Sequence, residues 1–144
     1  MFLKINTPYG KITMRCIFML IIHTADLHLG ASPDKEQPWG KNRKQELWYS
    51  FERLIETVEE QQADLLLIAG DLFDSDHITA RTEKYVLDLI ASHPTLSFFY
   101  LAGNHDRGNH LRQIENKPEN LYLFGDGWTS YELGEVTVTG SEKP

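Results

Sequence analysis

Three short segments of this chain carry the kinds of side chain that bind divalent metal ions. They read Asp26-Leu27-His28, Gly70-Asp71-Leu72-Phe73-Asp74 and Gly103-Asn104-His105-Asp106. Carboxylate and amide oxygens together with imidazole nitrogens form a typical donor set for such ions. Each segment directly follows a run of apolar residues, so each would lie just beyond the end of a strand. The pattern predicts one metal site built from three loops.

The apolar runs that precede these segments are predicted to be strands of a parallel sheet. Their ranges are residues 17–24, 64–69 and 96–101. The first run is apolar on both faces, which is typical of a central parallel strand. Strands in parallel order place their carboxyl ends at one edge of the sheet, where the three loops can meet.

Two amphipathic helices are expected between these strands. Apolar residues recur at three- and four-residue spacing over residues 45–61, and a second helix is predicted over residues 80–92 with Thr79 as its N-cap. A long polar loop over residues 25–43 precedes the first helix. The chain therefore reads as strand–loop–helix units of an α/β fold.

Both ends of the chain depart from this alternation. Short β-prone segments at residues 121–124, 129–133 and 135–139 predict a strand-rich section near the carboxyl end. Residues 1–18 show no periodicity, so we expect them to be an extension that precedes the domain and could lie upstream of the true start. The domain itself is predicted to cover residues 19–144.

The composition bounds the class of protein. The chain has 144 residues, of which 41% are hydrophobic and 24% charged, and these values suit one globular domain. No apolar run reaches the length of a membrane span. A single cysteine excludes an internal disulfide framework and fits a cytoplasmic location. The net charge of −7 argues against tight, non-specific binding of DNA by this segment alone.

The candidate residues suggest distinct roles in phosphoester chemistry. Asp26 and His28 can point into one crevice, while the Asp71 carboxylate could bridge two cations and Asn104 offers a neutral oxygen. Two bound cations polarise a phosphate and lower the pKa of a bridging water, which can then attack phosphorus. His105 is suited to donate a proton to the leaving group, with Asp106 orienting its ring.

Simpler explanations exist for each residue taken alone. An Asp or a Gly-Asp pair after a strand is most often a turn residue. Trp48 is expected to pack beneath the long loop rather than form a substrate wall, and a basic cluster at Lys41, Arg43 and Lys44 is expected to be a solvated face rather than a phosphate contact. Asp74 either braces its loop or supports the ligands. The joint occurrence of three ligand-type segments still favours a metal site.

The motifs Asp-x-His, Gly-Asp-x-x-Asp and Gly-Asn-His-Asp, in this order, resemble the first three motifs of the calcineurin-like metallophosphoesterase superfamily. The fuller strings His-Thr-Ala-Asp-Leu-His-Leu-Gly and Leu-Ile-Ala-Gly-Asp-Leu-Phe-Asp resemble its DNA-repair exonuclease branch, which includes the nuclease subunit of the bacterial SbcCD complex. The resemblance covers residues 19–110 well. It implies a sandwich of two β-sheets flanked by helices, with the site at the ends of strands.

The resemblance also implies roles for single residues. Asp26, His28, Asp71 and Asn104 would be the ligands of two divalent ions, most often Mn²⁺, with Asp71 as the bridge. His105 would be the proton donor or would stabilise the transition state.

One departure from the family pattern is clear. The family's further histidine and its Gly-His-x-His motif are missing, because no histidine follows His110. We therefore expect the amino-terminal part of a longer enzyme, with weak metal binding and little activity on its own.

The function expected from the resemblance is metal-dependent cleavage of phosphodiester bonds, as a DNA exonuclease whose partner is an SMC-like ATPase. Two alternatives stay open at this point. One is a phosphoesterase acting on small molecules or phosphoproteins, which the same three motifs would serve. The other is an inactive fragment that binds a partner through exposed sheet edges.

Overall fold

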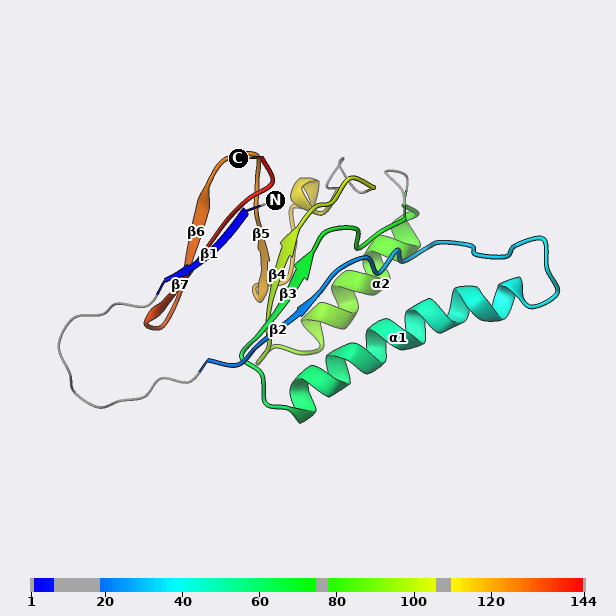
Figure 1. The fold of residues 1–144 in the computed structure, drawn as a ribbon, viewed down its shortest axis with the longest axis horizontal. Coiled ribbons are helices and arrows are strands. Elements are labelled where there is room, and N and C mark those ends of the chain that lie inside the picture. Colours follow the sequence, from blue (N-terminus) through cyan, green and yellow to red (C-terminus); the bar gives the residue numbers. More distant parts are fainter. Residues whose placement is uncertain (1, 7–18, 75–77, 106–109, 144) are drawn as a thin grey trace.

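The computed structural model describes residues 2–6, 19–74, 78–105 and 110–143. This part of the chain forms three layers, which Figure 1 shows from one side. A parallel sheet lies in the middle, and helices α1 (Gly40–Glu60) and α2 (Ala80–Ala91) cover one of its faces. A small antiparallel sheet covers the other face. The predicted α/β fold with two sheets and flanking helices is confirmed.

The middle sheet contains four parallel strands in the order β2-β3-β4-β5. They are β2 (Ile21–Thr24), β3 (Leu65–Ala69), β4 (Ser97–Leu101) and β5 (Leu121–Leu123). β3 is buried along its whole length, as its unbroken apolar sequence predicts. Because the strands are parallel, the loops after β2, β3 and β4 all leave the same edge.

The first strand differs from its prediction. Among the described residues β2 pairs with β3 alone and lies at the edge of the sheet, not at its centre. Its residues are therefore only half-buried, and His23 is exposed. The apolar sequence of β2 shows its propensity to form a strand but carries no information about which neighbours it has. Residues 17 and 18 of the predicted strand lie outside the described part.

The predicted start of α2 is more accurate than that of α1. α2 begins at Ala80, and the hydroxyl of Thr79 accepts the Thr82 N–H at 3.1 Å, which confirms the predicted N-cap. α1 begins at Gly40, before the predicted residue 45. Its apolar stripe starts only with Leu47, so apolar periodicity cannot reveal the polar turns before it. A side chain at Gly40 would meet the Asp34 carbonyl oxygen at 2.4 Å, which explains the glycine there.

The outer sheet is antiparallel, in the order β1-β7-β6. Its strands are β1 (Phe2–Asn6), β6 (Thr129–Leu133) and β7 (Val136–Ser141). β6 and β7 match two of the predicted carboxyl-terminal strands. β1 was not predicted, since its hydrogen-bonding partner β7 lies at the opposite end of the chain. The domain boundary at residue 19 stays a prediction.

Successive side chains of the central strands point to opposite faces of the sheet, so the hydrophobic core has two parts. Leu66, Ile68 and Phe98 face the helices, where Phe51 and Ile90 meet them. Their neighbours Leu65, Leu67 and Phe99 face the outer sheet and pack against its residues. Both faces of the middle sheet are thus packed against other elements. This packing fixes the positions of its strand ends. Within the described residues no helix is long and apolar enough to cross a membrane.

Candidate metal centre

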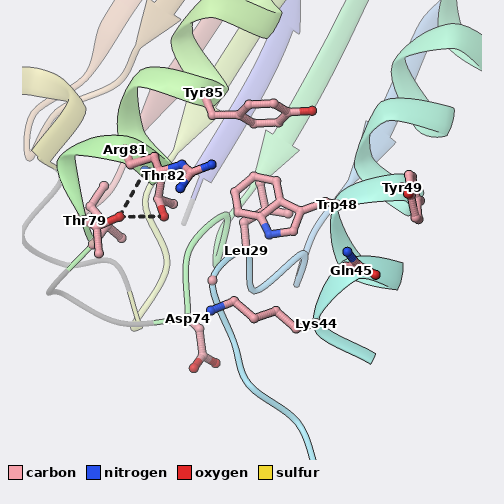
Figure 2. Close-up of a pocket in the computed structure, with 12 residues that line it drawn as sticks. Leu29, Lys44, Gln45, Trp48, Tyr49, Asp74, Thr79, Arg81, Thr82 and Tyr85 are labelled. Carbon is pink, nitrogen blue, oxygen red and sulfur yellow. Dashed lines mark hydrogen bonds between the residues drawn. The ribbon is translucent and has the colours of Figure 1, made fainter. Parts of the chain in front are cut away.

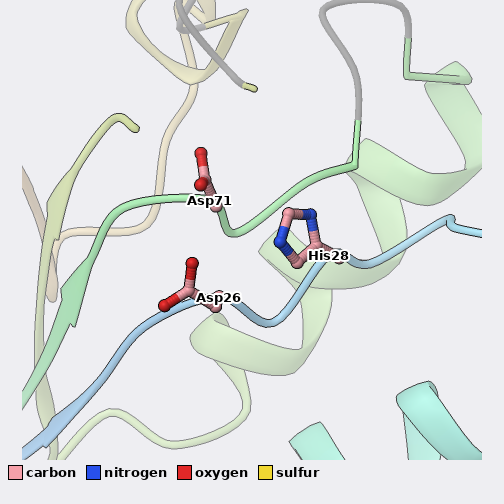
Figure 3. A group of neighbouring side chains, drawn as sticks. All are labelled: Asp26, His28 and Asp71. Atoms are coloured by element: carbon pink, nitrogen blue, oxygen red, sulfur yellow. The ribbon is translucent and has the colours of Figure 1, made fainter. Parts of the chain in front are cut away.

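Three predicted ligands meet at the carboxyl-terminal edge of the parallel sheet. Asp26 and His28 come from the loop after β2, and Asp71 comes from the loop after β3 (Figure 3). Each side chain offers one ligand atom, and these atoms lie within 4.8 Å of one another. Two carboxylates and one imidazole at this spacing can bind one divalent cation together.

The backbone at these three residues is unusual. Asp26, His28 and Asp71 have φ angles of 56°, 45° and 49°, in the left-handed region that few residues other than glycine adopt. Such conformations cost free energy and persist where the surrounding structure enforces them, often at functional sites. The coincidence of all three with the predicted ligands supports a functional role for these loops.

Backbone hydrogen bonds hold the first two loops together beyond the ends of their strands. The N–H groups of Asp26, His28 and Leu29 donate to the carbonyl oxygens of Gly70, Asp71 and Leu72, at 3.2, 2.9 and 2.8 Å. The pairing of β2 with β3 thus continues through the ligand residues. The relative positions of His28 and Asp71 are therefore set by backbone contacts, which makes the site preformed.

The third loop is tied to Asp71. The His105 N–H donates to Asp71 Oδ1 at 2.9 Å. At Gly103 a Cβ atom would lie 2.1 Å from the same oxygen, so only glycine permits this approach. Gly70 has a φ of +100° and faces Gly103 across the gap. Gly70 thus provides a sharp turn before Asp71, and Gly103 permits the close approach of Asp71.

The imidazole ring of His28 has a buried nitrogen atom, Nδ1. Its Nδ1 has no hydrogen-bond partner among the described residues, although Asp74 Oδ1 lies 3.3 Å away. A buried polar atom without a partner is costly, and binding of an ion by the ring would orient it toward the neighbouring carboxylate. This orphaned atom and the mixed oxygen and nitrogen donors fit a divalent metal ion. Asp74 lies where a carboxylate could orient the imidazole ring of His28.

The other two predicted site residues lie nearby. Asn104 is exposed and lines a cleft of about 720 Å³ together with Asp26 and Asp71. The His105 ring is also exposed, and its centroid lies 5.1 Å from that of His28 in an edge-to-face arrangement. Asp106, predicted to orient His105, lies outside the described residues. The structure thus gathers all five candidates in or beside one cleft.

Sequence reasoning missed three further residues that line this cleft, Asp126, Glu142 and Lys143. Glu142 Oε1 accepts the Ala102 N–H at 3.2 Å, and Glu142 Oε2 forms an ion pair with Arg112. A hydrogen bond from Lys143 holds the pKa of the Asp126 carboxyl below its ordinary value. No spacing in the sequence marks these residues, because the pairing of β7 with β6 brings them to the cleft.

Comparison with known proteins agrees with this geometry. A family model described as calcineurin-like phosphoesterase matches residues 19–140. DNA double-strand break repair protein Mre11 of Aeropyrum pernix is 36% identical over 89 residues, which are 60% of this chain and 20% of that protein. A subunit of the nuclease SbcCD of Escherichia coli K12 is 36% identical over 92 residues, which are 61% and 21% of the two chains.

A solved structure, that of the Pseudomonas putida nuclease MPE, shares the fold with a TM-score of 0.50 at 20% identity. The alignment covers 76% of this chain and 49% of that one. The chain spans only about a fifth of the length of the two curated relatives named above.

Proposed function

We propose that this chain, which belongs to the calcineurin-like phosphoesterase family, carries the metal-binding part of a hydrolase that cleaves phosphodiester bonds in DNA. The family predicted from the three motifs is confirmed, and membership indicates a hydrolase of phosphate esters. The choice of DNA and of exonuclease activity is the proposal. Support comes from the relatives, which are named as a break-repair protein and a nuclease subunit.

The observation that carries this proposal is the convergence of Asp26, His28 and Asp71. Their ligand atoms lie within 4.8 Å of one another, on backbone that is left-handed at all three positions. A turn-forming role would account for an isolated aspartate in this conformation. It would not account for a histidine that lies beside two carboxylates and whose buried Nδ1 has no hydrogen bond to any residue that the structure describes.

The proposed site holds two divalent ions, with Mn²⁺ as the proposed metal. Asp26, His28, Asp71 and Asn104 would hold them, and Asp71 would contact both. When bound, such ions polarise a phosphate and lower the pKa of a coordinated water. Asp71 is only 7% exposed, so its charge is poorly screened by solvent and attracts cations strongly.

His105 is proposed to donate the proton that the leaving group requires. Its ring is exposed toward solvent, as a group that meets substrate must be. Its backbone N–H is anchored on Asp71, so the position of the loop that bears the ring is coupled to that ligand. General acid catalysis of this kind contributes about 10²- to 10⁴-fold to a rate.

The partner and the location are proposed from the family resemblance. The SbcCD relative is named as one subunit of a nuclease, which supports a partner protein, and we propose an SMC-like ATPase. The cytoplasm is the proposed location. With a net charge of −7, the chain would contact DNA only over limited surfaces, and partner and metal would contribute the remaining attraction.

Manganese titration calorimetry on the chain beside Asp71→Asn tests the proposed metal site. The wild-type chain should bind Mn²⁺, and the variant should bind it more than about 100-fold more weakly, since a ligand is lost. Asp88→Asn, an exposed carboxylate on α2, is the matched control and should bind normally. Absence of binding by the wild-type chain, or equal binding by Asp71→Asn, would contradict the site.

An assay on linear DNA in the same buffer tests the substrate. Because the chain alone is expected to have little activity, the expected result is slow cleavage that requires Mn²⁺ and falls about 10²- to 10⁴-fold in His105→Ala, with Mn²⁺ affinity unchanged. Hydrolysis of a small nitrophenyl phosphoester without any cleavage of DNA would instead assign the site to small substrates.

A further inference from the structure

A second cavity, of about 550 Å³, lies between α1 and α2 beside the metal centre (Figure 2). Its walls include Lys44, Trp48 and Tyr49 of α1, Arg81 and Tyr85 of α2, and Asp74. We call it the aromatic pocket. Its volume is that of a small-ligand site, and its lining joins aromatic rings to cationic side chains. The metal centre makes no use of these groups.

The aromatic side chains of the pocket are accessible to solvent to different degrees, with Tyr49 and Tyr85 exposed and Trp48 partly buried. Trp48 and Tyr85 meet edge to face, with centroids 5.2 Å apart and planes at 84°. Tyr85 is 41% exposed and Tyr49 is 65% exposed, although large aromatic side chains usually bury most of their surface. The Tyr85 hydroxyl is held by Glu52, so this ring stays fixed at the pocket wall. Fixed, accessible rings of this kind are the platforms on which nucleic-acid bases stack.

The two cations of the pocket have no ionic partner in the part of the chain that the structure describes. Among the described residues neither Lys44 nor Arg81 forms a hydrogen bond or ion pair through its charged group, whereas Lys84 on the same α2 surface pairs with Asp88. Figure 2 shows the Lys44 side chain reaching from α1 toward Leu29 and Asp74. Two cations around aromatic rings provide attraction for an anion attached to a flat ring.

The aromatic pocket and the metal centre share a wall. Asp74 lines the pocket, and its Oδ1 lies 3.3 Å from Nδ1 of His28. Leu29, another wall residue, directly follows His28. A chain-like substrate held in the pocket could therefore continue to the metal centre without crossing a large distance. An isolated small molecule would gain nothing from this proximity.

We propose that the aromatic pocket binds one unpaired nucleotide of a DNA strand whose neighbouring phosphodiester lies at the metal centre. The base would stack on the face of one of the two perpendicular rings, Trp48 or Tyr85, and meet the other ring edge to face, and Lys44 and Arg81 would contact its phosphate. The identity of the ligand rests on the proposed function, since cleavage of DNA is what would bring a strand here. The pocket makes single-stranded or frayed ends the favoured substrate, because bases in a duplex cannot reach the rings.

Binding of two labelled hexamers, measured by fluorescence anisotropy in EDTA, tests this proposal. One is a six-nucleotide thymidine strand, and the other has the same phosphates but no bases. The chain should bind the thymidine strand about 5- to 150-fold more tightly, the range that stacking of a base provides. Trp48→Leu and Tyr85→Leu should each reduce that preference, while Trp39→Leu, an exposed tryptophan outside the pocket, should preserve it.

The phosphate contact has its own readout. Lys44→Ala should weaken binding of both hexamers and reduce the slope of log affinity against log salt by about 0.7 for one lost contact. Lys41→Ala, on the same helix but outside the pocket, is the matched control. Equal affinities for the two hexamers, or an unchanged preference in both aromatic variants, would overturn the proposal.

Self-association that Tyr49→Ser abolishes in sedimentation would also overturn the proposal, because a second copy would then fill the pocket. Since EDTA removes metal, these results do not depend on the metal centre. Base-dependent binding without any Mn²⁺ binding in calorimetry would reject the proposed function and leave the pocket as a nucleotide site.

Discussion

At the amino-terminal edge of the parallel sheet, the side-chain amide of Asn120 contacts the carbonyl oxygens of Ile90, His93 and Leu96 at 3.0, 2.9 and 3.0 Å. At the carboxyl-terminal edge, by contrast, His28 Nδ1 is buried without a hydrogen-bond partner among the described residues. The amide nitrogen at the amino-terminal edge is thus fully hydrogen-bonded, whereas one buried nitrogen at the carboxyl-terminal edge has no hydrogen bond within the described residues.

The backbone differs between the two edges as well. Three left-handed residues, Asp26, His28 and Asp71, gather at the carboxyl-terminal edge, whereas Gln62 is the left-handed residue found where α1 ends at the other edge. A left-handed residue after a helix is a common way to end it. The left-handed residue at one edge thus ends a helix, whereas the left-handed residues at the other edge coincide with the candidate ligands.

The largest loss of stability is expected from Gly103→Ala, at the carboxyl-terminal edge. The new Cβ would lie 2.1 Å from Asp71 Oδ1, so the third loop must shift. We expect the free energy of unfolding to fall by about 2–3 kcal/mol in a urea titration, with Mn²⁺ affinity falling as well. Gly127→Ala meets no atom within 4 Å and is the control. Equal behaviour of both variants would show that Gly103 does not position Asp71.

Asn120→Ala should affect stability and spare the metal centre. It removes the donor shared by three carbonyl oxygens, so we expect the free energy of unfolding to fall by about 2 kcal/mol. Mn²⁺ affinity, measured by calorimetry on the folded variant, should stay unchanged. A parallel loss of Mn²⁺ affinity would break the division between the two edges.

Asp26→Gly should relieve the backbone strain at this position while it removes a metal ligand, so the two effects can be measured separately. Glycine adopts a φ of 56° without steric cost, so the free energy of unfolding should rise by up to about 1 kcal/mol while Mn²⁺ affinity is lost. Gln62→Gly, at a φ of 55° on the other edge, should raise stability similarly and leave Mn²⁺ affinity intact. If Asp26→Gly lowers stability, the strain at this loop has been misjudged.

The smallest effect concerns Asp126, which lines the cleft. The hydrogen bond from Lys143 lowers the pKa of this carboxyl, so the interaction stabilises the fold above about pH 4. That contribution is lost as the pH falls through the lowered pKa. In Lys143→Met, carboxyl NMR titration should show the pKa of Asp126 rising toward its ordinary value. An unchanged pKa would mean that Lys143 is not its partner.

Much of the fold could be predicted because its signals are local. The apolar run before Gly70-Asp71 and the N-cap at Thr79 act over a few residues, and both are confirmed. The polar first turns of α1 carry no apolar periodicity, so its start was missed. β1 and the edge position of β2 depend on pairing between distant segments, which no local pattern reports.

The candidate site shows the same division. Residue types and order were enough to predict that Asp26, His28 and Asp71 converge. Their left-handed backbone was not predictable, because aspartate and histidine also occur in ordinary conformations at strand ends. Glu142 and Asp126 reach the cleft through the outer sheet, so only the tertiary structure reveals them. The roles of Asn104 and His105 stay predictions.

The sharpest test of the difference between the two edges is paramagnetic broadening by Mn²⁺ of the amide signals in an NMR spectrum of the ¹⁵N-labelled chain. Substoichiometric Mn²⁺ should erase the signals of Asp26, His28 and Asp71 first, and those of Ala63, Ser97 and Asn120 at the other edge should persist. Uniform broadening, or broadening centred on the exposed carboxylates of α1, would contradict a metal centre at the carboxyl-terminal edge.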